Sequence, residues 1–145
     1  METITFLKQV EMFNGLSDDS LKKIAALCHT QTFAPGEVII ARNDPPNAFY
    51  LIENGTVEVF TAPENETAAD PVIVSLSTGQ SFGEMGLVDQ GPRSATVKAA
   101  TSVTTRKIDC EAFLKLCEQD PLVGFKVMHN IAADLSFKLR YRNLI

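Results

Sequence analysis

Apolar and polar positions follow a helical period at both ends of the chain and a strand period between them. Residues 3–10 predict a short helix, and residues 15–28 predict a second helix whose apolar residues share one face. Ser17 suits the N-cap of this second helix, and Asp18 and Asp19 favour its positive start. We therefore expect a pair of helices to flank the β-rich part of the chain.

The middle of the chain consists of short apolar runs, rich in β-branched residues, that turn residues separate. Pro35-Gly36 marks one such turn. Asn54-Gly55 accepts the positive φ angles of a tight turn and stands between two apolar runs, which predicts a hairpin over residues 48–60. A polar loop is expected over residues 62–71. Seven or eight short strands at this spacing predict a sandwich, a jelly roll or a barrel.

The last third of the chain is again helical. Residues 110–119 predict a short helix that ends near Pro121, because proline lacks a backbone donor and adds ring bulk, and residues 121–144 predict a long helix. An apolar stripe with alternating spacings of three and four runs along this long helix, formed by Phe125, Met128, Ala132, Leu135 and Leu139. Either the stripe packs on its own domain, or it forms a dimer seam whose repeat is too short to establish a coiled coil.

Length and charge narrow the class of protein. One domain over residues 1–145 is expected, since this length suits one sizeable core. The net charge of -5 argues against nucleic acid or an anionic membrane as a direct partner, because phosphate binding needs a basic face. No apolar run approaches the roughly 20 residues of a membrane span, so membrane insertion is not expected.

Cysteines and histidines indicate neither a disulfide framework nor a metal site. Cys28, Cys110 and Cys117 are odd in number and lack CxxC spacing, which predicts free thiols in a reducing, cytoplasmic compartment. His29 and His129 are far apart in sequence, without a ligand cluster around either, so neither a bound metal nor a metal-dependent enzyme is expected.

The candidate chemistry lies in residues 81–101, where glycines and a proline interrupt the strand pattern. Gly83 and Gly86 bracket Glu84-Met85 in a segment of about one helical turn. Glycines let a ligand approach the backbone, and the open N–H groups of a short helix start favour an anion.

Two opposite charges stand out in this stretch. Arg93 can offer a planar pair of donors to a phosphate, and Ser94 adds a hydroxyl. Glu84 only accepts when ionised, so it suits a sugar hydroxyl. Together they describe a site for a nucleotide monophosphate; the alternative is that Glu84 and Arg93 simply pair with each other.

These residues resemble the phosphate-binding cassette of the cyclic nucleotide-binding domain family: Phe-Gly-Glu-Met-Gly-Leu over residues 82–87, then Pro-Arg-Ser-Ala-Thr-Val over residues 92–97. The resemblance extends to four further segments in the family's order, residues 7–28, 33–40, 49–59 and 109–121. It implies a mainly β fold, an eight-stranded jelly-roll β-barrel (a double-stranded β-helix) with N-terminal helices and a C-terminal helical lid.

The resemblance also implies roles for individual residues. Glu84 accepts a hydrogen bond from the ribose 2′-hydroxyl, and Arg93 holds the cyclic phosphate. The remaining ligand-binding residues form the phosphate cradle around them, namely Gly83, Met85, Gly86, Ser94 and Ala95. Apolar strand residues are candidates for the wall behind the base, namely Val59, Ile73 and Val74.

The implied function is a non-enzymatic sensor in signal transduction, whose ligand is cAMP or cGMP and whose C-terminal helix closes over the base and relays occupancy. Ser94 favours cAMP over cGMP. In the catabolite activator branch a helix-turn-helix follows the long helix; none follows up to Ile145, so direct DNA binding is not expected. A homodimer or a protein partner through the long helix, and a vestigial scaffold without ligand, are the open alternatives.

One departure from the family pattern precedes the expected hairpin. Residues 41–49 read Ala-Arg-Asn-Asp-Pro-Pro-Asn-Ala-Phe, where relatives often have a glycine. We expect Pro45 and Pro46 to stiffen a loop that lies away from the phosphate.

Overall fold

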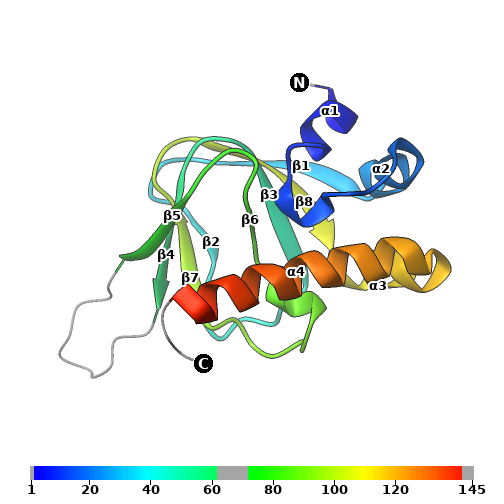
Figure 1. Cartoon of the computed structure of the whole chain (residues 1–145). Coiled ribbons are helices and arrows are strands. Elements are labelled where there is room, and N and C mark those ends of the chain that lie inside the picture. The colour runs from blue at the N-terminus through cyan, green and yellow to red at the C-terminus, as the bar shows by residue number, and fades with distance from the viewer. Residues whose placement is uncertain (1, 62–71, 142–145) are drawn as a thin grey trace.

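The computed structural model describes residues 2–61 and 72–141, so the polar loop expected over residues 62–71 lies outside the described residues (Figure 1). The helices are α1 (Thr3–Leu7), the 3-10 turn η1 (Glu11–Phe13), α2 (Asp18–Ala25), the 3-10 turn η2 (Glu84–Leu87), α3 (Cys110–Gln119) and α4 (Pro121–Tyr141). The strands are β1 (Cys28–Phe33), β2 (Val38–Ile40), β3 (Ala48–Asn54), β4 (Val57–Thr61), β5 (Val72–Leu76), β6 (Ser81–Phe82), β7 (Ala95–Ala99) and β8 (Val103–Asp109). Among these helices, none combines the length and the apolar character needed to cross a bilayer.

The strands form two antiparallel four-stranded sheets, with the orders β1-β8-β3-β6 and β2-β7-β4-β5. The expected jelly roll of eight strands with helices before and after it is confirmed, although the two sheets are not hydrogen-bonded into a closed barrel. In Figure 1, α4 runs from the side of the molecule where α2 lies toward the ends of β4, β5 and β7.

Strand β3 is the centre of the core because both of its faces are covered. Phe49 and Leu51 pack against the helices, while Tyr50 and Ile52 point between the two sheets. All four side chains are buried, which explains why this strand reads as a continuous apolar run rather than an alternating one. The helices therefore pack on the outer face of one sheet and leave the space between the sheets to a second core.

The hairpin predicted over residues 48–60 is wrong. Strand β3 pairs with β8 and β6, whereas β4 pairs with β5 and β7, so the chain crosses between the sheets at Asn54-Gly55. Gly55 has a φ of 100°, and a Cβ built on it would lie 2.3 Å from the carbonyl oxygen of Ser102. The Asn-Gly pair thus forms the turn by which the chain passes from one sheet to the other, where the backbone of Ser102 lies too close for a side chain.

The second N-terminal helix is shorter than predicted. The side chain of Ser17 accepts from the backbone N–H of Ser20, as expected of an N-cap. The helix ends at Ala25, because residues from Cys28 onward form β1, which pairs along its length with β8. Most side chains of this edge strand are exposed and polar, so its sequence lacks an apolar alternation that would mark it as a strand.

The α4 helix packs through a different row of residues from the predicted stripe. Val123, Val127 and Ile131 are its buried residues, at spacings of four. Of the predicted stripe, Met128 packs against the core. Phe125 is 67% exposed and Leu139 is 39% exposed, so the stripe as a whole does not pack on its own domain. The amide of Asn130 donates to the carbonyl oxygens of Met12 and Asn14, and the ammonium of Lys126 donates to that of Gly15. These bonds hold the first half of α4, up to Ile131, against η1 and the residues that follow it. They add to the contacts that the buried row makes with the core.

Candidate functional site

The candidate site is built around two glycines, one directly before the η2 turn and one within it. The expected single helical turn is present, and Gly83 precedes it with a φ of 83°. A Cβ on Gly83 would lie 3.0 Å from Nη1 of Arg93, and one on Gly86 would lie 2.8 Å from Cβ of Pro46. Both positions therefore require a residue without a side chain, because neighbouring groups approach the backbone there.

Arg93 is held by backbone groups on both sides. Its guanidinium donates from Nη1 to the carbonyl oxygen of Gly83 at 2.9 Å and from Nη2 to that of Ala48. Its backbone N–H donates to the carbonyl oxygen of Asp44 at 2.9 Å, and its own carbonyl accepts from Asn43 at 2.8 Å. The side chain is therefore oriented without a ligand, and a guanidinium has further N–H groups to offer an anion.

These contacts also correct the expectation for the proline loop. The loop of residues 43–46 runs beside Arg93, and Pro46 lines the same hollow as Gly86. It does not lie away from the candidate phosphate site. The prolines stiffen a segment whose backbone supports Arg93. The two segments are about 50 residues apart in sequence, so no local pattern predicts their contact.

Glu84 is half-buried, and one of its carboxylate oxygens is buried without a hydrogen-bond partner. Among the described residues, Oε2 of Glu84 is the buried side-chain oxygen or nitrogen without a hydrogen bond. Burial raises the pKa of Glu84, the nearby charges of Lys138 and Arg93 lower it, and Asp134 raises it. Glu84 and Arg93, both described, form no ion pair with each other, so the alternative that they merely pair is wrong.

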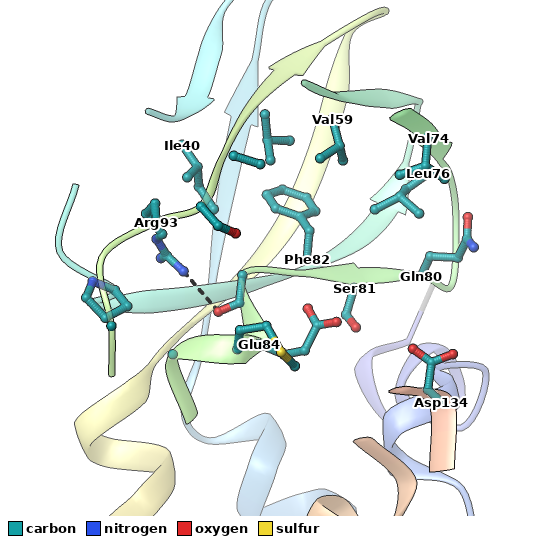
Figure 2. A pocket seen from close by; sticks show the side chains of 18 of the residues that line it. Ile40, Val59, Val74, Leu76, Gln80, Ser81, Phe82, Glu84, Arg93 and Asp134 are labelled. Atoms are coloured by element: carbon teal, nitrogen blue, oxygen red, sulfur yellow. Dashed lines mark hydrogen bonds between the residues drawn. The ribbon is translucent and has the colours of Figure 1, made fainter. Parts of the chain in front are cut away.

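A hollow of about 560 Å³ brings the predicted residues together. It is lined by Gly83, Glu84, Met85, Gly86, Arg93, Ser94 and Ala95, and by Val59 and Val74 of the expected base wall. The side chain of Ile73, in β5, lies outside the described part of the chain. Figure 2 shows Arg93 toward one end of this hollow, Glu84 nearer the middle, and the apolar side chains along one wall. The volume suits a small ligand.

The C-terminal helix was expected to close over the ligand, but none of its residues was predicted for the site, and neither was a contribution of η1 to this hollow. Asp134 and Lys138 of α4 and Glu11 of η1 also line it. Nζ of Lys138 lies 2.8 Å from Oδ2 of Asp134, with spacing i,i+4. The sequence shows that spacing, but such pairs are common on solvated helix faces, so it does not mark a site. The apolar residues Ile40, Leu76 and Phe82 extend the wall and were not predicted either.

The arrangement offers three chemistries in one cavity. Arg93, the hydroxyl of Ser94 and the open N–H groups at the start of η2 suit an anion, although η2 spans a single turn. The buried oxygen of Glu84 suits a hydroxyl donor. The apolar wall suits a flat ring. In the described ranges, 2–61 and 72–141, no group of three or more His, Cys, Asp or Glu residues is placed to hold a metal ion.

Comparison with known proteins agrees with this arrangement. The sequence profile of the cyclic nucleotide-binding domain matches residues 30–120. The cAMP-dependent protein kinase regulatory subunit of Emericella nidulans is 39% identical over 111 residues, which are 77% of this chain and 26% of that protein. The chain thus spans about a quarter of the length of the curated relatives it matches.

Solved structures show the same fold. The catabolite activator protein of Thermus thermophilus superposes with a TM-score of 0.79 at 28% identity, over 92% of this chain and 60% of that one. The regulatory domain of Toxoplasma gondii PKA, crystallised with cAMP, gives 0.80 at 21% identity, over 92% of this chain and 48% of that one. From its profile match and its fold, the chain belongs to the cyclic nucleotide-binding domain family.

Proposed function

We propose that residues 1–145 form one sensor module that binds a cyclic nucleotide monophosphate, prefers cAMP to cGMP, and relays occupancy through α4. The observation that carries this proposal is the separation of charge in the hollow. Arg93 is oriented by two backbone carbonyls and Glu84 keeps a buried oxygen without a partner. A cyclic phosphate and a ribose hydroxyl supply what these two groups lack.

The proposed roles follow the geometry of the hollow. The cyclic phosphate binds Arg93, the hydroxyl of Ser94 and backbone N–H groups near Gly83, Gly86 and Ala95, with Met85 at the partly exposed rim. The ribose 2′-hydroxyl donates to Glu84. The base lies against Val59 and Val74, and Ile73 is proposed for the same wall. These are all binding roles, in which no bond is made or broken, so the proposed module is not an enzyme.

The preference for cAMP rests on Ser94, a small residue directly after the arginine. The Emericella relative is named for dependence on cAMP, and the Toxoplasma structure is a complex with cAMP, which supports the same ligand class here. Isothermal titration of the folded protein with each nucleotide tests the proposal. We expect saturable binding with a lower Kd for cAMP. Absence of binding at millimolar nucleotide would defeat the sensor, and a lower Kd for cGMP would defeat the preference.

The relay is proposed because α4 divides into two halves. The near half is anchored through Val123, Val127, Ile131 and the bonds of Asn130, whereas residues 132–141 include no buried side chain. A ligand can relay its presence only if it favours one position of this far half. Amide exchange of residues 132–141 should slow on addition of cAMP while that of residues 121–131 changes little. Equal exchange with and without cAMP would contradict the relay.

The exposed apolar face of α4 supports an additional role in association. Leu122, Phe125 and Leu139 are exposed large apolar residues on this helix, which suits a homodimer or a protein partner. For a homodimer, sedimentation should show a dimer that Phe125→Glu converts to a monomer without loss of cAMP binding. A monomeric wild type at high concentration would exclude the homodimer.

The same face favours the second candidate function, a scaffold that has lost its ligand and contacts another protein. A partner bound equally well by wild type and Arg93→Ala without nucleotide would support this candidate. We also propose a cytoplasmic location, because Cys28, Cys110 and Cys117 are free thiols.

A further inference from the structure

Glu84 stands between two hollows rather than at the edge of one. A second hollow of about 460 Å³ lies between η1, η2 and α4. Both hollows are lined by Glu84, Met85, Asp134 and Lys138. The α4 helix therefore faces the carboxylate of Glu84, and it does so from the side opposite the apolar wall (Figure 2).

The charged groups around Glu84 come from four places in the fold. They are Asp134 and Lys138 on α4, Arg93 before β7, Glu11 on η1 and Asp89 after η2. Lys138 and Asp134 contact each other at 2.8 Å, and both remain partly exposed. Figure 2 shows Asp134 on its helix, on the side of Glu84 away from Arg93. Asp134 and Lys138 lie in the part of α4 that does not pack into the core, since residues 132–141 include no buried side chain.

We propose that Asp134 and Lys138 are positioning residues for the ribose-binding carboxylate: from α4 they set how readily Glu84 carries the negative charge with which it accepts a sugar hydroxyl. This inference rests on the proposed function, because it assigns a role in nucleotide binding to residues outside the cassette. Neither residue needs to touch the ligand. Their effect passes through the charge of Glu84.

The direction of each effect follows from its sign. An ionised carboxylate accepts a more strongly held hydrogen bond than a neutral acid. Lys138 stabilises the ionised form of Glu84, and Asp134 opposes it. Removing Asp134 therefore keeps Glu84 ionised to lower pH, and removing Lys138 lets it take up a proton at higher pH. Because the two charges act in opposite directions, a movement of the whole far half of α4 removes both effects together, and only the single substitutions separate them.

The test is the pH dependence of cAMP affinity in wild type, Asp134→Asn and Lys138→Gln. We expect the wild-type Kd to be constant at high pH and to rise about fivefold as Glu84 becomes protonated. The midpoint of this rise should move to lower pH in Asp134→Asn and to higher pH in Lys138→Gln. With the 2′-deoxy analogue of cAMP, which lacks the hydroxyl, the rise should disappear.

A matched control exists on α3. Glu111 and Lys115 form an i,i+4 pair of the same kind, 3.5 Å apart, and line neither of these two hollows. Glu111→Gln and Lys115→Gln should leave the midpoint unchanged. The carboxyl carbon shift of Glu84, followed by NMR in ligand-free protein, gives the same midpoint without any nucleotide.

Each result decides between the two proposals. If wild type binds cAMP and its midpoint stays in place in both α4 variants, or moves the same way in both, the inference fails and the proposed function stands. A rise that persists with the 2′-deoxy analogue also overturns it. If wild type binds neither nucleotide at any pH, the proposed function fails and this inference fails with it.

Discussion

Replacing Arg93 with alanine removes the group that we assign to the cyclic phosphate. A hydrogen bond to a charged group contributes about 1.5–3 kcal/mol, and about 1.4 kcal/mol corresponds to a tenfold change in Kd. We therefore expect the Kd for cAMP to rise roughly 10- to 150-fold. The same side chain donates to the carbonyls of Gly83 and Ala48, so its loss also lowers the free energy of unfolding, by about 3–6 kcal/mol when the same figure is applied to each of these two hydrogen bonds.

Arg93→Lys separates charge from geometry. Lysine keeps the positive charge but lacks the planar fork that reaches both carbonyls. Its ammonium group therefore cannot bond both carbonyls and the phosphate at the same time. We expect a Kd between those of wild type and the alanine variant. Isothermal titration measures binding, and urea unfolding measures stability, for each protein.

Arg140→Ala is the matched control, since it also removes one positive charge but lines neither hollow. Its Kd should stay within about threefold of wild type. A folded Arg93→Ala variant whose Kd changes no more than this control would refute the assignment of the phosphate to Arg93.

Two further predictions concern stability. Gly55→Ala should lower the free energy of unfolding by at least about 2 kcal/mol, because the added Cβ meets the Ser102 carbonyl. Gly36 has a φ of 85° and nothing within 4 Å of an added Cβ, so Gly36→Ala should lower it by only about 1 kcal/mol, from backbone strain. Equal losses in urea unfolding would contradict this. The hydrogen bond from Lys23 holds the pKa of Asp120 below its usual range, so the stability difference between wild type and Asp120→Asn should be present at neutral pH and vanish as pH falls through that lowered pKa. A difference that persists in strong acid would show that the carboxylate charge is not its source.

The parts of the fold that the sequence predicts well are those that depend on neighbouring residues. The Ser17 cap, the η2 turn and the end of α3 before Pro121 are all local. The pairing of β3 and β4 was mispredicted because Asn54-Gly55 signals a turn but not the sheet to which the next strand belongs. Only the backbone of Ser102, nearly 50 residues away, shows why the glycine is there.

The two apolar rows of α4 illustrate a second limit. The row at alternating spacings and the row at spacings of four are both apolar, and periodicity alone does not select between them. The contacts of Asn130 and Lys126 with the η1 region fix the helix rotation, and these involve carbonyl groups that the sequence does not display. The buried row was therefore missed.

The candidate site shows the same division. Glu84 and Arg93 lie within ten residues of each other, so their joint chemistry could be inferred from one short segment. Asp134 and Lys138 lie more than 40 residues further along the chain and reach the hollow only because α4 folds back across it. Pro46 joins the site from the other direction, through its contact with Gly86.

The division of α4 at Ile131 has a mechanical consequence. Ile131 is the last buried residue of the helix, and ten residues follow it to Tyr141. At 1.5 Å of rise per residue this helical segment is about 15 Å long. A tilt of about 20° about Ile131 would carry its tip about 5 Å. In the proposed relay, a change of contact beside Glu84 that tilts this segment would therefore displace the end of the helix further than the contact itself moves, and a partner bound at that end would experience the larger displacement.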